Sequence, residues 1–135
     1  MTGEALAKAA EDLIGTRFIL HGRNPKHGLD CIGLLAAAMI AIGRPIAIPS
    51  GYPMRVRDLP AWLPNPTARG LAAASAPFEP GDVVIVQPGA VQFHLAIAAQ
   101  NGGWVHAHAG LRRVVHDPVI PAGTLIHHWR LIPQT

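Results

Sequence analysis

The chain has 135 residues, half of them hydrophobic and 14% charged, with a formal net charge of +3 at pH 7. This size and composition predict a single globular domain over residues 1–135 and exclude a disordered chain. The eleven Lys and Arg residues are scattered along the chain, so the positive charge predicts no nucleic-acid interface.

Residues 3–14 predict an amphipathic helix that ends at Gly15. The apolar face of this helix consists of Leu6, Ala9, Ala10, Leu13 and Ile14. The first residues lack the basic start and apolar run of a secretory signal, so we expect a protein that is cytoplasmic when it is synthesised. No apolar run reaches the roughly 18 residues of a membrane span, so none is predicted.

Cys31, the one cysteine of the chain, lies at the start of a second predicted helix. The run 34–43 has no charged residue, so this helix is expected to be buried, with its N-terminus facing a loop. Asp30 is placed to cap the helix, and the N–H groups and dipole of the first turn are expected to shift the thiol toward thiolate. A lone cysteine in an apolar helix is more often an inert core residue, so a reactive thiol needs support from elsewhere in the chain.

The region after this helix predicts a long irregular segment followed by strands. Residues 44–66 contain six prolines, with Tyr52 and Trp62 among them, and these aromatic residues either shape a substrate groove or cap the core. Residues 67–76 predict one more short helix. From residue 82 onward a hydrophobic period of two predicts strands at 82–87, 91–99, 104–109, 112–116 and 124–132. Helices first and strands second predict an α+β fold in which the cysteine helix packs on an antiparallel meander.

His94 is the histidine that this fold is expected to bring to Cys31. On its predicted strand it shares a face with Gln92, Ala96 and Ala98. Because alanines on that face allow a helix to approach closely, we expect the cysteine helix to pack there. His94 then lies near the thiol, where a base is needed to activate it.

His106 is the residue predicted to orient the His94 imidazole. A hairpin centred on residue 100, with its loop at 99–101, places the two histidines directly opposite each other. A two-residue turn at 101–102 does so only if a bulge at Gly103 restores the correct face. His108 is then a residue of the rim. The histidines predicted to take no part are His21, His27, His116, His127 and His128.

A metal site is the competing interpretation, because His94, His106 and His108 supply three imidazoles. It leaves Cys31 without a role, and the sequence contains neither Cys-x-x-Cys nor His-Glu-x-x-His. The sequence therefore predicts no metal and no other cofactor.

These motifs, in this order, resemble those of the NlpC family of bacterial and phage cell-wall cysteine peptidases. Residues 15–22 resemble the family's Gly-x-Pro-Tyr-x-x-Gly-Gly segment, and residues 30–33, Asp-Cys-Ile-Gly, resemble its Asp-Cys-Ser-Gly. Residues 94–97, His-Leu-Ala-Ile, resemble the strand that begins His-Val-Gly-Ile, and His106 matches the second histidine. Residues 79–82, Glu-Pro-Gly-Asp, resemble the entry to the first strand. A single domain without a signal is similar to the phage-type branch, which is encoded with tail genes of phages and gene-transfer-agent-like particles.

The resemblance implies a papain-like fold and hydrolysis of amide bonds in peptidoglycan stem peptides, commonly next to D-γ-glutamyl. It implies Cys31 as the nucleophile, His94 as the base and His106 as the orienting residue. The expected partners are the peptidoglycan peptide and phage tail proteins, so the protein is expected to be associated with a virion or tail and to act on the cell wall.

The positions expected to contact substrate are Asp30, Phe18 and His108. Phe18 stands where the family usually has a tyrosine, and Ile32 replaces the serine after the nucleophile, so either change can affect catalysis or substrate choice. Two alternatives remain. One is a catalytically inactive tail-assembly or structural protein on the same fold, and the other is acyl transfer to a lipid or amine.

Overall fold

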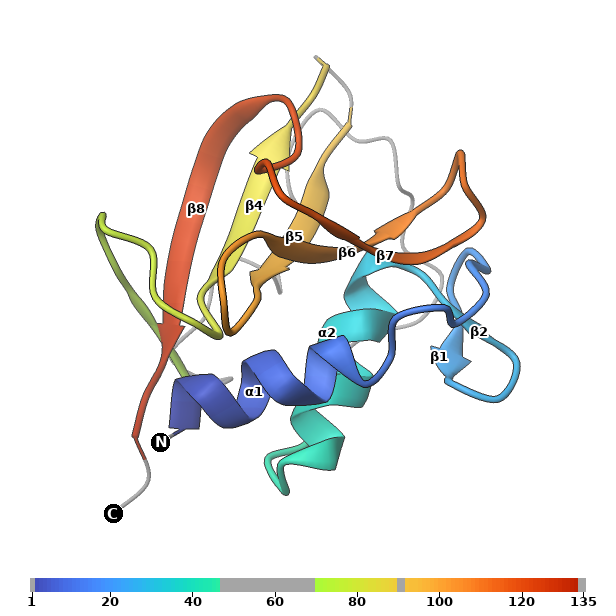
Figure 1. The fold of residues 1–135 in the computed structure, drawn as a ribbon, viewed down its shortest axis with the longest axis horizontal. Coiled ribbons are helices and arrows are strands. Elements are labelled where there is room, and N and C mark those ends of the chain that lie inside the picture. Colours follow the sequence, from blue (N-terminus) through green and yellow to red (C-terminus); the bar gives the residue numbers. More distant parts are fainter. Residues whose placement is uncertain (1, 47–69, 90–91, 134–135) are drawn as a thin grey trace.

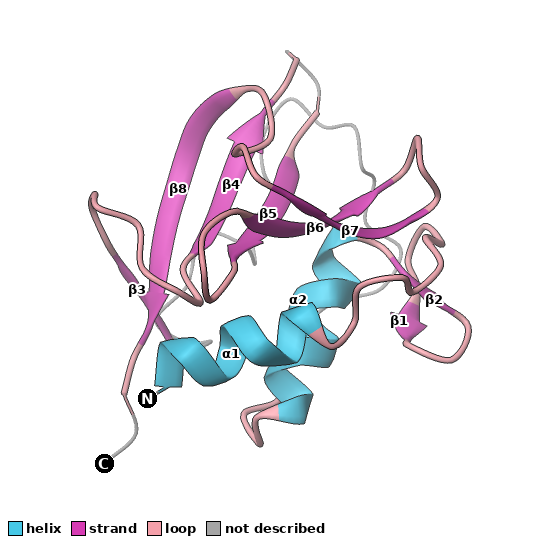
Figure 2. Cartoon of the chain, viewed as in Figure 1, coloured by secondary structure: helices cyan, strands magenta, loops and turns pink. Residues whose placement is uncertain are grey.

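The structure is a computed structural model that describes residues 2–46, 70–89 and 92–133. In these ranges it contains two helices and eight strands (Figures 1 and 2). In chain order they are α1 (Thr2–Glu11), β1 (Arg23–Asn24), β2 (Gly28–Leu29), α2 (Cys31–Ala41), β3 (Leu71–Ala73), β4 (Val83–Gln87), β5 (His94–Ala98), β6 (Trp104–His108), β7 (Arg113–Asp117) and β8 (Thr124–Leu131). None of the helices described is long and apolar enough to span a membrane.

The strands confirm the α+β fold but correct the order expected for the sheet. Six strands form one antiparallel sheet in the order β3-β8-β4-β5-β6-β7, and β1 pairs with β2 in a separate hairpin. Strands β4 to β7 form the predicted meander, but β8 returns to pair with β4 instead of extending the far edge (Figure 1). The expectation of a simple meander is therefore wrong for the last strand.

The core lies between the helices and one face of the sheet (Figure 2). On β5 this face carries Leu95 and Ile97, which join Cys31 in the main hydrophobic cluster. Ala96 and Ala98 belong to a smaller cluster on the other face. The expectation that the alanine face of β5 receives the cysteine helix is thus wrong. Helix α2 is itself rich in alanine, so bulky strand residues are needed to fill the space beneath it.

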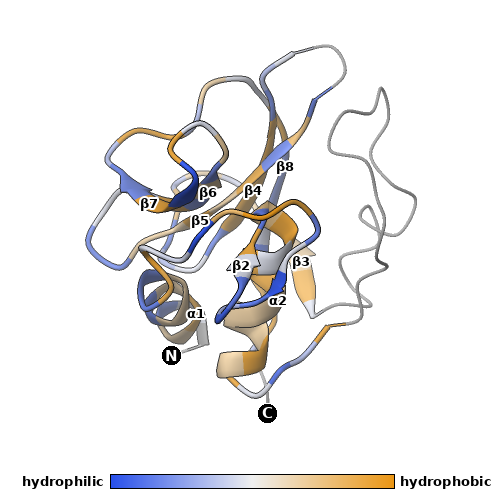
Figure 3. Cartoon of the chain, turned by 90° about the vertical axis from the view of Figure 1, so that its right-hand side faces the viewer, coloured by the Kyte–Doolittle hydropathy of each residue, from blue (hydrophilic) through white to orange (hydrophobic). Residues whose placement is uncertain are grey.

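Helix α2 is buried from Cys31 to Met39, as its uniformly apolar sequence predicts (Figure 3). It ends at Ala41, and Gly43 follows in the left-handed region with φ 77°. That conformation is accessible to glycine at little cost and turns the chain away from the helix. Helix α1 packs against α2 and both contact the sheet.

The helix predicted at residues 67–76 is wrong where the structure describes it. Leu71–Ala73 instead forms β3, and Leu71 is buried opposite Leu131 of β8. Pairing with the sheet edge and burial of one leucine outweigh the helix propensity of the neighbouring alanines. Residues 47–69, with Tyr52 and Trp62, lie outside the described residues.

The segment between α1 and β1 runs along the edge of β7. The N–H groups of Gly15 and Phe18 donate to the carbonyls of Val114 and Arg112, and the Thr16 carbonyl accepts from Val114. The segment also joins β2, since the Leu29 N–H donates to the carbonyl of residue 17. These hydrogen bonds place Phe18 beside the start of α2, where the candidate site is built.

Candidate active site

Asp30 organises the N-terminus of α2. Its Oδ1 accepts from the Gly33 N–H at 2.7 Å, which is the predicted N-cap, and its Oδ2 accepts from the His21 N–H at 2.8 Å. Arg23 Nη1 lies 3.4 Å from Oδ1. The side chain is 0% exposed, so it offers no surface to a substrate. The predicted cap at Asp30 is confirmed, while its burial disagrees with the additional expectation that it contacts substrate.

Gly33 allows the preceding loop to cross the first turn of this helix. A Cβ placed at Gly33 would clash with the carbonyl oxygen of Gly22, which is a backbone atom. A Cβ placed at Gly22 would in turn clash with the carbonyl oxygen of Gly28. The glycines of the two motifs thus hold the loop against the helix start.

Cys31 is the first residue of α2 and is 0% exposed. Its sulfur is within hydrogen-bond range of the backbone of Leu95, of Ile32 and of Cys31 itself. Burial, with a smaller contribution from the charge of Asp30, raises the pKa of the thiol from 9.0 to about 12. The expected shift toward thiolate is therefore wrong in this state, because the loss of hydration outweighs the helix dipole and the backbone donors.

Strand β5 carries both the backbone of Leu95, which lies at this sulfur, and the neighbouring His94. Strands β5 and β6 are paired at Ile97 with Val105 and at Ala98 with Trp104. Beyond these pairs, His94 Nε2 and His106 Nδ1 share a hydrogen bond of 2.9 Å, with the rings nearly perpendicular at 87°. The predicted contact between these two histidines is therefore present.

The register that creates this contact differs from the predicted one. The hairpin is centred on residue 101 instead of 100, and the Ala99 N–H donates to the carbonyl of Gly103. Gly102 and Gly103 both have positive φ, of 92° and 82°, so the turn forms later in the chain than expected. The shift is even, so His106 keeps its face and becomes the diagonal neighbour of His94.

His94 is held as a neutral imidazole. Burial, followed by the nearby His106 and His108, lowers the pKa of His94 from 6.5 to about 4. In the part of the chain that the structure describes, its second nitrogen, Nδ1, has no hydrogen-bond partner, and no hydrogen bond joins it to the Cys31 sulfur. A neutral ring with a free Nδ1 can accept a proton.

His106 is 4% exposed and lies between His94 and Asp117. Its Nε2 is buried without a hydrogen bond, and the nearest carboxylate oxygen, Asp117 Oδ2, is 3.6 Å away. That separation exceeds a hydrogen bond but is within ion-pair range. Burial lowers the pKa of His106, and the Asp117 charge opposes this effect. Sequence reasoning missed Asp117, although the β6–β7 register, which pairs it with Trp104, puts it on the His106 face.

Two clefts meet at His94. One has a volume of about 350 Å³ and is lined by Phe18, Leu20, Pro88, Gln92, Phe93, His94, Ala107 and Ala109. The other has a volume of about 360 Å³ and is lined by Pro88, His94, His106, His108, Ala109, Gly110, Asp117, Pro121 and Ala122. Phe18 and His108, both expected near substrate, thus line different clefts that share His94. Cys31 is not among the described lining residues of either cleft.

The same histidines bear on the metal alternative. Among the described residues no group of three or more His, Cys, Asp or Glu side chains is arranged to hold a metal ion. The nitrogens that face each other in His94 and His106 are joined by their hydrogen bond, and His108 Nδ1 accepts from the Leu111 N–H at 2.9 Å. The geometry is that of a hydrogen-bonded chain rather than a shared coordination centre.

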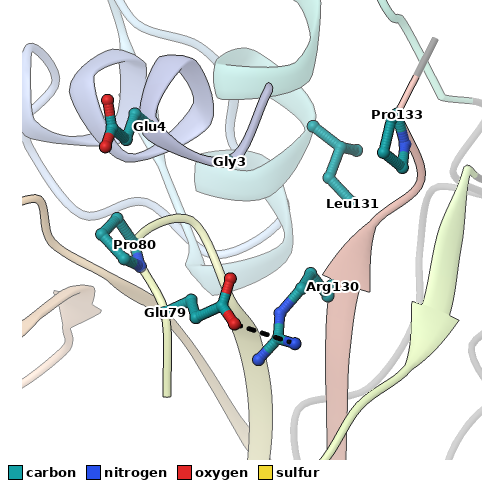
Figure 4. A pocket seen from close by; sticks show the side chains of 7 residues that line it. All are labelled: Gly3, Glu4, Glu79, Pro80, Arg130, Leu131 and Pro133. Atoms are coloured by element: carbon teal, nitrogen blue, oxygen red, sulfur yellow. Dashed lines mark ion pairs between the residues drawn. The ribbon is translucent and has the colours of Figure 1, made fainter. Parts of the chain in front are cut away.

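A further pocket of about 350 Å³ lies away from the histidines, between the start of α1 and the end of β8 (Figure 4). Its charged wall is Arg130, which pairs with Glu79 at 3.3 Å. Arg130 Nε also donates to Asp82 at 2.8 Å, and His128 Nε2 lies 2.6 Å from the same carboxylate. These contacts tie the end of β8 to the turn before β4, and Glu4 of α1 adds a second carboxylate to the pocket lining.

The helix that begins at Cys31 packs on an antiparallel sheet that carries the histidine pair. Comparison with solved structures shows that this α+β arrangement is the fold of NlpC/P60 domains. The NlpC/P60 domain of the peptidoglycan hydrolase SagA matches with a TM-score of 0.64 and 21% identity, over 97% of this chain and 100% of that domain. The peptidoglycan hydrolase RipB from Mycobacterium tuberculosis matches with a TM-score of 0.59 and 23% identity, over 98% of this chain and 65% of that one.

NlpC2 from Trichomonas vaginalis matches with a TM-score of 0.65 and 18% identity. The match covers 95% of this chain and 46% of that protein, so the chain spans less than half the length of this relative. No protein-family model matches the chain, and no curated protein sequence matches it. At these identities the likeness establishes the fold, and the chemistry must be argued from the residues.

Proposed function

We propose that the chain is a cysteine peptidase that hydrolyses amide bonds in peptidoglycan stem peptides, with Cys31 as nucleophile, His94 as base and His106 as orienting residue. The observation that carries the proposal is the 2.9 Å hydrogen bond between His94 and His106, next to Leu95, whose backbone lies at the Cys31 sulfur. The substrate class is supported by the shared fold with domains of peptidoglycan hydrolases.

The reaction starts from a neutral thiol and a neutral imidazole, because burial raises the pKa of Cys31 and lowers that of His94. The sulfur attacks the amide carbon while its proton passes to His94 Nδ1, and the C=O electrons move to the oxygen. The Cys31 N–H at the helix start helps to hold this oxyanion. His94 then protonates the leaving amine, and the C–N bond breaks to leave a thioester.

Water completes the cycle. His94 removes a proton from a water molecule that attacks the thioester, and the C–S bond breaks to release the carboxylic acid and regenerate the thiol. The two clefts beside His94 provide room for the substrate on both sides of the scissile bond. Phe18 lines one cleft and His108 the other, so we propose that these two residues contact the peptide.

The test is incubation of the protein with defined stem peptides, followed by mass spectrometry of the products. We expect a new amino and a new carboxyl terminus at one bond, and loss of both in Cys31→Ala and His94→Ala. His27→Ala, a change of an exposed histidine in the β1–β2 loop, is the matched control and retains activity. The proposal fails if the unmodified protein releases no product, or if Cys31→Ala still does. A product joined to an added amine would instead indicate acyl transfer.

A second candidate function is a structural protein that keeps the fold without turnover, and one observation favours it. Cys31 has no exposed surface and no hydrogen bond to His94 in the part of the chain that the structure describes. In this case we propose assembly with tail proteins of a phage or phage-like particle, a setting that rests on the sequence resemblance. Stable binding to such proteins, with no peptide hydrolysis, distinguishes this candidate from the enzyme.

A further inference from the structure

We infer that Asp117 is a positioning residue of the site. Acting through His106, it keeps the lone pair of His94 on Nδ1, the ring nitrogen that does not face His106. This inference rests on the proposed function, because it assigns a role in activating the same thiol. The three side chains form a chain from the protein surface inward. Asp117 is half-buried at the end of β7, His106 is buried on β6, and His94 starts β5 at the meeting point of the clefts.

The contacts of its two oxygens define the position of the Asp117 carboxylate. Oδ1 accepts from the Val119 N–H at 3.0 Å, a local turn that fixes the side chain, and Oδ2 faces His106 Nε2 at 3.6 Å. His106 Nε2 is the one buried side-chain nitrogen or oxygen without a hydrogen-bond partner among the described residues. A buried nitrogen that faces a carboxylate is stabilised as a donor and destabilised as a lone pair.

This preference determines where the protons lie in the histidine pair. With a proton on His106 Nε2, the neutral ring has a lone pair on Nδ1, which must accept from His94 Nε2 across the 2.9 Å hydrogen bond. A neutral His94 that donates through Nε2 has its lone pair on Nδ1. The carboxylate of Asp117 therefore selects the His94 tautomer that can accept the proton of a thiol.

The opposite arrangement places a lone pair against a carboxylate and leaves His94 without a free acceptor. If His106 carried its proton on Nδ1, its Nε2 lone pair would face the Asp117 carboxylate, and His94 would carry its proton on Nδ1, where it could not act as a base. The other titratable ring near His106 is His108, at 5.7 Å between centroids, and its Nδ1 is occupied by the Leu111 N–H. Among the described residues, His108 makes no hydrogen bond to His106 Nε2.

The substitution Asp117→Asn tests the inference at the level of single atoms. The amide oxygen can keep the hydrogen bond to Val119, which leaves the amide nitrogen in the place of Oδ2, with its N–H groups directed at His106 Nε2. A donor at that place favours a lone pair on Nε2 and so reverses both tautomers. Because size and the local turn are preserved, the fold is expected to be retained.

The experiment measures the ring tautomers by ¹⁵N NMR of histidine-labelled protein at neutral pH, together with kcat/KM for a stem peptide. In the unmodified protein we expect protons on Nε2 of both His94 and His106. In Asp117→Asn we expect both to move to Nδ1, with kcat/KM lowered roughly 10- to 100-fold. That loss is smaller than the about 10⁴-fold effect of the equivalent change in serine peptidases, because the separation here is longer.

Two controls separate positioning from stability and charge. Asp117→Glu keeps the carboxylate and is expected to retain the His94 tautomer and more activity than Asp117→Asn. Asp12→Asn removes an exposed carboxylate that pairs with Lys8 and is expected to change neither readout. Unchanged tautomers in Asp117→Asn, or a His94 proton on Nδ1 in the unmodified protein, overturn the inference. Absence of hydrolysis in the unmodified protein overturns the proposed function, while the tautomers still decide the role of Asp117.

Discussion

The reactivity of Cys31 toward a small haloacetamide gives a direct test of its surroundings. Burial raises the pKa of the thiol from 9.0 to about 12, so at neutral pH its thiolate fraction is about 1000-fold lower than that of a free cysteine. A more basic thiolate is a better nucleophile, and a Brønsted coefficient of about 0.4–0.5 restores roughly 15- to 30-fold. We therefore expect alkylation about 30- to 60-fold slower than that of a free thiol, before any further slowing because the sulfur is 0% exposed.

The assay follows labelling by mass spectrometry from about pH 5 to about pH 11, with the urea-unfolded chain as the free-thiol reference. We expect the rate in the folded protein to rise about tenfold per pH unit, without a plateau near neutrality. His94→Ala is expected to leave the neutral-pH rate low. A fast plateau between about pH 5 and about pH 7 that disappears in His94→Ala would refute this reasoning, since it is the signature of a thiolate–imidazolium pair.

Three further predictions concern stability. Gly33→Ala brings a Cβ against the backbone carbonyl oxygen of Gly22, so we expect loss of at least about 2 kcal/mol of unfolding free energy in urea, and an unchanged value would contradict the close approach. The pKa of His94, about 4 when folded and 6.5 in an unfolded chain, means that the unfolded state binds more protons between these values. Stability is therefore fully present above about pH 6.5 and falls by up to about 3 kcal/mol as the pH drops to about 4, and His94→Gln is expected to flatten this dependence in denaturation measured against pH. Asp82→Asn leaves Arg130 without its buried partner and is expected to cost about 3 kcal/mol, whereas Asp12→Asn, at the exposed pair with Lys8, serves as the control and should cost less than about 1 kcal/mol.

Local sequence signals predict the elements of the site well, because each depends on neighbouring residues. The cap at Asp30, the start of α2 at Cys31 and its burial follow from residue types within one helix. The strands of His94 and His106 follow from the period of two, and the parity of their alternation places both histidines on one face. These features bring the two rings within reach even though the exact pairing was predicted two positions away.

Features that depend on distant contacts could not be predicted in the same way. The sheet face on which α2 packs depends on the side-chain volumes of both the helix and the strand. The alanine face of β5 would leave a gap against the alanine-rich helix, whereas Leu95 and Ile97 on the other face fill that space. The return of β8 to the side of β4 is a contact between segments far apart in the chain. Asp117 comes to His106 through the register of one more hairpin, which no single motif encodes.

Burial is the main cause of the pKa shifts of both Cys31 and His94. Burial disfavours the charged form of each group, so it raises the pKa of the acid and lowers that of the base, and an ion pair at rest is disfavoured. Under the proposed mechanism, negative charge on the sulfur develops during attack, as the proton leaves for His94. The backbone groups of Leu95, Ile32 and Cys31 lie at the sulfur, where they oppose the effect of burial on the pKa of the thiol and would stabilise that charge. The proposed site therefore holds a neutral thiol at rest, and charge forms on the sulfur only as its bond to the substrate carbonyl forms.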